Sequence, residues 1–261
     1  MAFISTNSFT MKPKYGALAT ATTIPFILIG GAYLAFAYFN RGSWRRKPNP
    51  RVRKRSVSMA ALHGGRIALQ RLIDYEEARA DSQKLDAAEY ELNDLLQQEY
   101  IDFPRMQSIV AKLEMSGNEA KAVQILRKEK LKALKEGKAH EGYEIEMLLV
   151  EMLIYKGEFQ NAFSCKCLNE EKISDARRHL FQAIIIIALE RPRYEELGKQ
   201  CWERFNELRE DFNDPPSFKE SIRESLEENG FYTLATSFNE FEKVVKKLKY
   251  DIQKAHSKKN K

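Results

Sequence analysis

Residues 148–163 read LLVEMLIYKGEFQNAF, and this stretch decides the fold. Its first eight residues contain a single charged side chain, Glu151, and the run ends at Gly157. Glycine is favoured just past the end of a helix because it adopts the left-handed backbone conformation without a steric penalty. A second apolar pattern starts at Phe159. The stretch therefore predicts two helices, 143–156 and 159–168, that form a hairpin around Gly157.

Similar hairpins are predicted on both sides of this one. The preceding hairpin starts at Pro104 and turns at Gly117-Asn118, and the following one covers residues 174–190, a turn at 191–193 and a second helix. Residues 184–187 are four isoleucines without a turn residue among them. The run is too short to cross a bilayer, so it predicts a buried helix. Because strand-like alternation is nearly absent, the region is predicted to be all-α.

The central stretch resembles the tetratricopeptide repeat (TPR) family. In that family a glycine closes the first helix of the repeat and an aromatic residue follows two positions later. A small alanine, five positions after the glycine, lets the two helices approach closely. Gly157, Phe159 and Ala162 occupy these three positions. The resemblance implies that these residues pack the two helices of a hairpin together.

Two further copies of the pattern are weaker. Gly117 and Ala122 fit a second copy, in which Glu119 replaces the aromatic residue, and a third copy after residue 191 lacks both the glycine and the alanine. The turns at 117, 157 and 192 are 40 and 35 residues apart, close to the family's period of about 34 residues. The resemblance implies an α-solenoid over residues 104–210 whose first helices line a groove for a protein partner. A non-repetitive helical bundle is the alternative.

The flanking segments are also predicted to be helical. Apolar residues recur at three- and four-residue spacing in 59–79 and 82–99, so residues 58–103 are expected to form N-terminal helices. Residues 215–256 are expected to form C-terminal capping helices. The last of these helices has a heptad-like apolar stripe. We expect this stripe to cover the end of the solenoid; self-association is the alternative. Residues 257–261 are predicted to be a disordered tail.

An uncharged segment near the N-terminus predicts a membrane anchor. Residues 15–39 contain no charged side chain, and a membrane-spanning helix needs about 20 mostly apolar residues. Residues 1–14 then form an N-terminal tail and 15–39 a single transmembrane helix. A cleaved signal peptide is an alternative, although the apolar part is longer than signal peptides use. A buried core helix is the third interpretation.

Charge divides the chain sharply. Twelve Lys and Arg residues precede the first acidic residue, Asp74, so the first 73 residues carry +12 and the remainder −6 of the net +6. Cations lie mainly on the C-terminal side of the anchor, which keeps the following domain in the cytosol, stroma or matrix. Residues 40–57 are predicted to be an extended basic linker that spaces the domain and contacts anionic lipid. The predicted lipid-facing cations are Arg45, Arg46, Lys47, Arg51, Arg53, Lys54 and Arg55.

No residue pattern predicts catalysis, a cofactor or a metal site. Cys165 and Cys167 are separated by one residue, not by the two of common zinc and redox motifs, and with Cys201 they are expected to pack within helices. His63 precedes two glycines, a combination that suits an anion site. It lacks the preceding strand and the lysine of a P-loop, so a packing role is favoured.

These patterns predict a non-enzymatic, single-pass protein of a chloroplast or mitochondrial membrane. Its TPR-like domain is expected to bind protein partners as a scaffold or assembly factor, without a small-molecule substrate. The alternative is a helical-repeat RNA-binding protein that uses the basic segment. The net charge of −6 after residue 73 disfavours nucleic acid as the partner.

Overall fold

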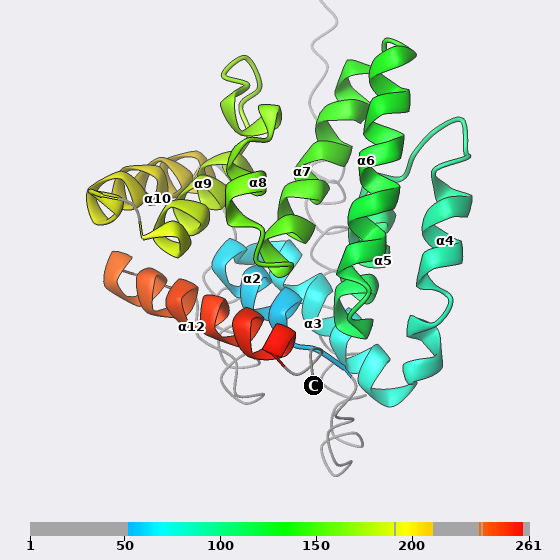
Figure 1. Ribbon diagram of the computed structural model, residues 1–261, viewed down its shortest axis with the longest axis horizontal. Helices are drawn as coiled ribbons and strands as arrows, with labels where there is room; N and C mark the ends of the chain where they lie inside the picture. The colour runs from blue at the N-terminus through cyan, green and yellow to red at the C-terminus, as the bar shows by residue number, and fades with distance from the viewer. Residues whose placement is uncertain (1–51, 191, 211–234, 236, 258–261) are drawn as a thin grey trace, which may run out of the picture. The chain divides into compact units, whose positions relative to one another are not determined.

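The described part of the chain is entirely α-helical, as predicted. A computed structural model describes residues 52–190, 192–210, 235 and 237–257, and none of them lies in a β-strand. Figure 1 shows the arrangement of the helices. Within these residues no helix combines the length and the apolar content that a membrane span requires. The predicted tail and anchor at 1–39, the linker up to residue 51 and the first capping helix lie outside the described residues.

Ten α-helices and two short 3-10 helices are described. In chain order they are α2 (Arg55–His63), α3 (Gly65–Ala80), η1 (Ser82–Leu85), α4 (Ala88–Leu95), α5 (Phe103–Ser116), α6 (Glu119–Lys135), α7 (Ala139–Tyr155), α8 (Phe159–Phe163), η2 (Lys166–Asn169), α9 (Ala176–Leu189), α10 (Tyr194–Glu210) and α12 (Phe238–Ser257).

The three predicted hairpins are present as α5–α6, α7–α8 and α9–α10, and α5, α7 and α9 pack against one another in sequence order. Gly117 and Gly157 end α5 and α7 with positive φ angles of 84° and 73°. After each glycine the next amide donates back to a carbonyl five residues earlier, from Asn118 to Leu113 at 2.8 Å and from Glu158 to Leu153 at 2.9 Å. Both turns are therefore glycine-dependent helix ends of the Schellman type.

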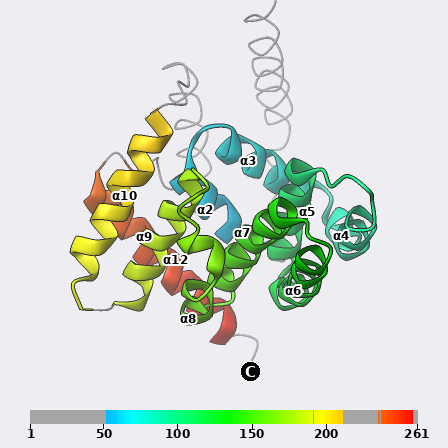
Figure 2. The same ribbon diagram turned by 90° about the horizontal axis from the view of Figure 1, so that it is seen from above.

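Helix α7 is the central element of the fold. Among residues 142–155 only Glu144 is not buried, because α5, α6, α8 and α9 all pack against this helix. Figure 2 shows α2 and α3 on one side of α7 and α6 and α8 on the other. The small residues Ala122 and Ala162 are fully buried, and Phe159 is buried beside them in the same apolar core. The four consecutive isoleucines at 184–187 lie in α9 and are buried, as predicted.

The N-terminal helices differ from the sequence-based prediction. Residues 59–79 are not one helix, because Gly64 separates α2 from α3 with a φ of 73° and a ψ of −172°. The segment 82–99 contains the short η1 and the eight-residue α4 in place of one long helix. The linker boundary at residue 57 was also wrong, because α2 already begins at Arg55 and is buried apart from Ser58.

The last helix, α12, packs against α2 and α9. Its apolar stripe is buried and comprises Phe241, Val244, Val245, Leu248 and Ile252. Phe241 lies 6.1 Å from the ring of Trp202 on α10. Near the other end of α12, the methyl Cγ2 of Ile252 approaches the turn between α7 and α8, 3.3 Å from the position that a Cβ atom on Gly157 would take. The stripe therefore joins the last helix to the hairpins.

The packing of α12 on this turn predicts different costs for two glycine substitutions. Gly137 and Gly157 both have a φ of 73°, but a Cβ on Gly137 would meet no atom within 4 Å. We expect Gly137→Ala to lower the free energy of unfolding by about 1–2 kcal/mol through backbone strain alone. Gly157→Ala should cost about 1 kcal/mol more, since Ile252 must also move.

Urea denaturation of the full-length protein in detergent, followed by far-ultraviolet circular dichroism, measures both values. Equal losses for the two variants would contradict the described contact between α12 and the α7–α8 turn.

Candidate functional site

A buried cluster of charges lies where the described chain begins. We call it the latch, and it comprises Arg53, Arg55, Glu114, Glu119 and the main-chain carbonyl of Tyr155. The Nε of Arg55 donates to Oε1 of Glu114 at 2.7 Å, and the amide of Ser56 donates to Oε2 of the same carboxylate at 3.0 Å. Arg55 is 4 % exposed and Glu114 is fully buried. A buried carboxylate of this kind is tolerated because both of its oxygens accept hydrogen bonds.

Glu119 balances the second positive charge of the latch. It is buried at the first position of α6 and forms ion pairs with both Arg53 and Arg55. The amide of Arg53 also donates to the carbonyl of Met115 at 2.9 Å, which fixes the backbone of this segment against the end of α5. Two cations and two anions therefore neutralise one another. Removing one partner of such a buried set leaves a charge without compensation, which costs about 3–5 kcal/mol.

The carbonyl of Tyr155 joins the two ends of the described chain. Nη1 of Arg55 donates to this oxygen at 2.9 Å, and Nε2 of His256 lies 3.3 Å from it. Tyr155 is the last residue of α7, where the carbonyls of the final turn have no partner within the helix and the helix dipole is negative. A cation is favourable at that position. The start of α2 and the last turn of α12 therefore meet at a single atom.

The latch corrects part of the predicted lipid-facing cluster. Arg53 and Arg55 are engaged with Glu114 and Glu119 and do not face a membrane. Lys54 is exposed, whereas Arg45, Arg46, Lys47 and Arg51 lie outside the described residues. The sequence did contain one signal for this pairing, because Glu114 lies between the apolar residues Leu113 and Met115 of the predicted hairpin around Gly117.

A second set of buried polar contacts fixes α3 against α7. Nη2 of Arg71 lies 3.5 Å from Oε1 of Glu151, and the hydroxyl of Tyr155 donates to the same oxygen at 2.9 Å. Burial, with the neighbouring charge of Glu151, raises the pKa of Tyr155 well above its usual value, so this hydroxyl stays protonated. Arg71 also donates to the carbonyl of Gln107 on α5. These contacts tie α3, α5 and α7 together.

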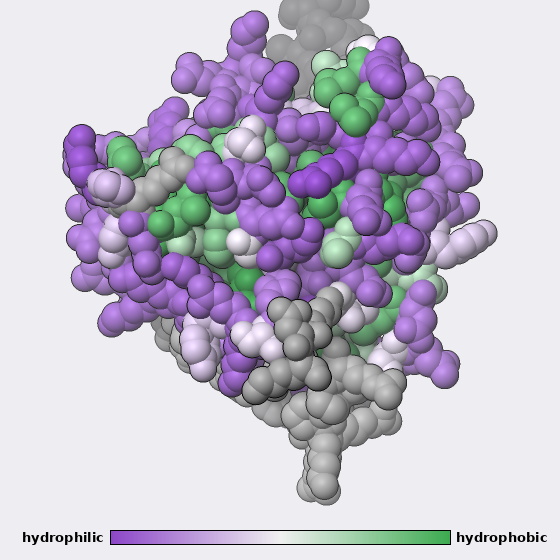
Figure 3. All heavy atoms as spheres, in the orientation of Figure 1, coloured by the Kyte–Doolittle hydropathy of each residue, from purple (hydrophilic) through white to green (hydrophobic). Residues whose placement is uncertain are grey.

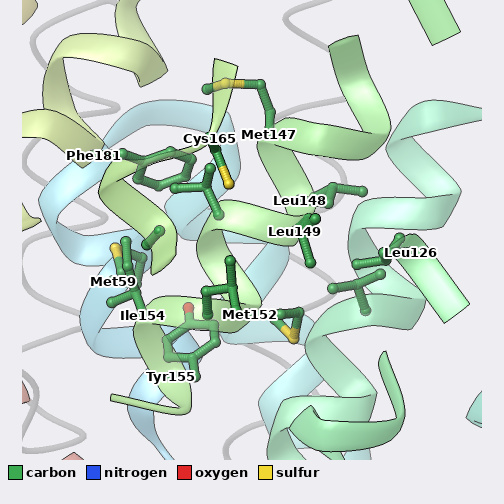
Figure 4. Packing of buried hydrophobic residues seen from close by; sticks show 14 of the residues in the cluster. Met59, Leu126, Met147, Leu148, Leu149, Met152, Ile154, Tyr155, Cys165 and Phe181 are labelled. Carbon is green, nitrogen blue, oxygen red and sulfur yellow. The ribbon is translucent and has the colours of Figure 1, made fainter. Parts of the chain in front are cut away.

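The inner face of the three first helices is filled by the chain itself. Met59 of α2 shares an apolar cluster with Phe181 of α9 and with Leu148 and Tyr155 of α7 (Figure 4). The ring of His63 meets that of Phe181 edge-on at 5.6 Å. The cavity left between these helices has a volume of about 10 Å³, which is room for roughly one water molecule. The inner face is therefore filled where α2 packs against α7 and α9. Beside it, a cleft of about 500 Å³ stays open between α3 and the start of α5, and it is lined by Ile67, Gln70, Arg71, Pro104, Arg105, Gln107 and Ser108.

His63 does not form an anion site. Its environment lowers its pKa to about 3, first through burial and then through the nearby charges of Arg177 and Arg71. The imidazole is therefore neutral at physiological pH, and its role is to pack α2 against α9.

An open cleft lies at the other end of α7, where the segment 96–101, the end of α6 and the start of α7 converge. We call it the distal cleft, and its volume is about 160 Å³. Its apolar lining consists of Leu96, Ile101, Ala133 and Ile145. Its charged lining consists of Glu99, Glu129, Glu136, Glu141, Lys132 and Lys138. Four carboxylates against two ammonium groups give the cleft a net negative charge.

Large apolar side chains are exposed next to this cleft. Tyr100 is 82 % exposed, Leu131 is 56 % exposed and Leu134 is 54 % exposed. Figure 3 shows apolar side chains surrounded by hydrophilic ones over the tip of α6 and α7. Leu131 and Leu134 lie on the side of α6 that faces away from the cleft-lining Glu129, Lys132 and Ala133, whereas Tyr100 lies between the lining residues Glu99 and Ile101.

The latch and the distal cleft lie at opposite ends of one rigid helix. Glu141 of the cleft is in the first turn of α7, and Tyr155 of the latch is its last residue. Since a helix rises 1.5 Å per residue, about 20 Å separate the two. Nothing in the amino-acid pattern indicated the cleft, because the segment 96–101 lies about 30 residues before the other two and meets them only in the folded chain.

The cysteines give no sign of a reactive or metal-binding site. Cys165 and Cys167 are buried thiols, and burial with the nearby charge of Glu146 raises the pKa of Cys165 to about 11 and that of Cys167 further. Such thiols remain protonated and unreactive. In the part of the chain that the structure describes, no group of three His, Cys, Asp or Glu side chains is arranged to hold a metal ion.

Comparison with known proteins gives no family assignment. No protein-family model matches the chain, and no match is found among curated proteins or solved structures. The TPR resemblance therefore rests on the glycine, aromatic and alanine positions of the sequence.

The latch predicts strong coupling between Arg55 and Glu114. We expect Arg55→Met and Glu114→Gln each to lower the free energy of unfolding by about 3–5 kcal/mol, because each leaves an uncompensated buried charge. The double variant keeps the pair of Arg53 and Glu119, so its loss should be smaller than the sum of the single losses by about 2 kcal/mol. Urea denaturation of the full-length wild type, the two single variants and the double variant gives the four free energies of unfolding that this comparison requires.

A matched control is the exposed ion pair of Arg204 and Glu207, whose atoms lie 2.8 Å apart. Arg204→Met should cost less than about 1 kcal/mol. Additive losses for the latch variants, or a loss as small as that of the control, would contradict the described cluster.

Proposed function

We propose that this protein is a membrane-anchored, TPR-like scaffold or assembly factor at a chloroplast or mitochondrial membrane, and that it binds a protein partner at the distal cleft. The observation that carries this proposal is the position of the cleft. An acidic cleft with an apolar floor lies at the far end of a buried helix, and the latch at its other end receives the chain that follows the predicted anchor.

The tether supports a function close to a membrane. The predicted anchor ends at residue 39, and residues 40–51 connect it to the described domain. Twelve residues span at most about 40 Å when fully extended. The latch end of the domain would thus stay within that distance of the bilayer. This is a property of assembly factors and recruiting scaffolds, which act by raising the local concentration of a partner.

The chemistry of the distal cleft indicates the kind of partner. Its net negative charge is complementary to a basic segment, and its apolar lining, with the exposed ring of Tyr100 beside it, offers contacts to apolar side chains. A basic amphipathic helix or an extended basic segment has both properties. The alternative of RNA binding is less well supported, because Arg53 and Arg55 of the basic segment are neutralised by glutamates.

Site-specific photo-crosslinking in isolated organelles tests this proposal. A photoreactive amino acid at Gln97 or Lys132, two exposed residues of the cleft, should crosslink the full-length protein to one defined partner, whereas the same group at Lys199, an exposed position on α10, should not. The double charge reversal Glu129→Lys/Glu136→Lys should reduce the crosslink at Gln97 at least about tenfold, because it makes the cleft basic.

The same samples report on the anchor, since the protein should remain in the membrane pellet after carbonate extraction. Equal crosslinking at Gln97 and Lys199, or no effect of the charge reversal, would refute the docking surface. Release into the supernatant would refute the membrane anchor.

A further inference from the structure

The outward face of α12 carries a basic stripe. Lys243, Lys247, Tyr250 and Lys254 are spaced by four, three and four residues, so they lie along one side of the helix. This side is opposite to the buried apolar residues of α12. Lys243, Tyr250 and Lys254 are exposed, and Tyr250 is 55 % exposed. The basic stripe is therefore available to a partner.

The charges of the basic stripe are only partly compensated. Lys247 forms an ion pair with Asp251. The neighbouring Lys246 and Lys249, at the edges of the stripe, pair with Glu242 and Glu190 at 2.8 Å each. Lys243 and Lys254, by contrast, have no ion pair within the described residues. The stripe therefore presents positive charge to the solvent while the flanks of the helix are nearly neutral.

An exposed aromatic ring lies in the middle of the stripe. The ammonium groups of Lys247 and Lys254 lie 5.1 and 5.8 Å from the centroid of the Tyr250 ring, within range of a cation–π interaction. Tyrosine combines an apolar ring with a polar hydroxyl, and it is enriched at the level of lipid headgroups for that reason. A tyrosine between lysines fits a headgroup layer better than it fits an apolar protein interface.

The position of the stripe relates it to the tether. His256 and Arg55 share the carbonyl of Tyr155, so the C-terminal end of α12 lies beside the residues that follow the linker. The 180 described residues form a domain with a diameter of roughly 40 Å, similar to the maximum reach of about 40 Å of residues 40–51. The tether alone therefore leaves the orientation of the domain open. A second contact near the latch is needed to fix it.

We propose that the basic stripe of α12 docks on the anionic lipid headgroups of the membrane in which residues 15–39 are anchored. This inference rests on the membrane anchor of the proposed function. Docking turns the outward face of α12 to the bilayer and keeps the latch end of α7 at the membrane. RNA, which also binds basic surfaces, is a weaker fit, since one tyrosine provides a single stacking platform where single-strand binders use several.

Lysine acetylation of the full-length protein in lipid nanodiscs tests the docking. Discs of phosphatidylcholine alone are compared with discs that contain about 30 % phosphatidylglycerol, because only the second kind offers a negative surface. Mass spectrometry then gives the rate at which an N-hydroxysuccinimide ester modifies each lysine. We expect the rates at Lys243 and Lys254 to fall at least about fivefold in the anionic discs and to recover at about 0.5 M salt. The rate at Lys128, an exposed lysine of α6, should stay constant.

Variants separate docking from insertion of the anchor. In anionic discs, the double variant Lys243→Glu/Lys254→Glu should abolish the protection of Lys247 from acetylation. The control Lys128→Glu/Lys199→Glu changes the net charge by the same amount and should leave that protection intact. Three outcomes would refute the docking surface without refuting the anchor. The acetylation rates of the stripe lysines could be equal in both kinds of disc, Lys128 could be protected from acetylation as strongly as they are, or added RNA could protect them in neutral discs. If the protein does not float with discs of either kind, the membrane anchor fails, and this inference with it.

Discussion

The burial of Arg55 is the constraint on which the rest of the structure depends. A guanidinium group that is 4 % exposed needs its charge compensated, and among the described residues Glu114, Glu119 and the C-terminal carbonyl of α7 do so. These groups come from α5, α6 and α7. Their convergence on one side chain fixes where α2 starts and directs it across the first helices of the hairpins. The same carbonyl receives His256, so α12 is positioned by this site as well.

This arrangement determines which surfaces remain for function. Because α2 packs against α7 and α9, the inner face is filled along these helices and α7 is buried, while a cleft remains open between α3 and α5. The two ends of α7 then differ in chemistry. The latch end is where the chain arrives from the predicted anchor and where the basic stripe of α12 ends, while the other end has the acidic distal cleft. The proposed function assigns the first end to the membrane and the second to a protein partner.

Local features of the fold could be predicted from the sequence, and long-range features could not. Gly117 and Gly157 mark helix ends through their own backbone preference, so the hairpins were predicted to within a few residues. Arg53 and Arg55 were assigned to a basic linker, since a charge run looks the same whether it faces water, lipid or a glutamate 59 residues away. The closure of the inner face and the distal cleft depend on segments that meet only after folding, and no local pattern records them.

Hydrogen exchange of the full-length protein, resolved by mass spectrometry, tests the central claim most directly. If α2 is an integral part of the domain, amides of residues 55–63 exchange as slowly as those of α7, because both open only with the whole core. Exchange of residues 55–63 much faster than that of α7 would contradict this account. It would mean that α2 leaves the inner face readily and that the groove of the helical hairpins is open to a partner.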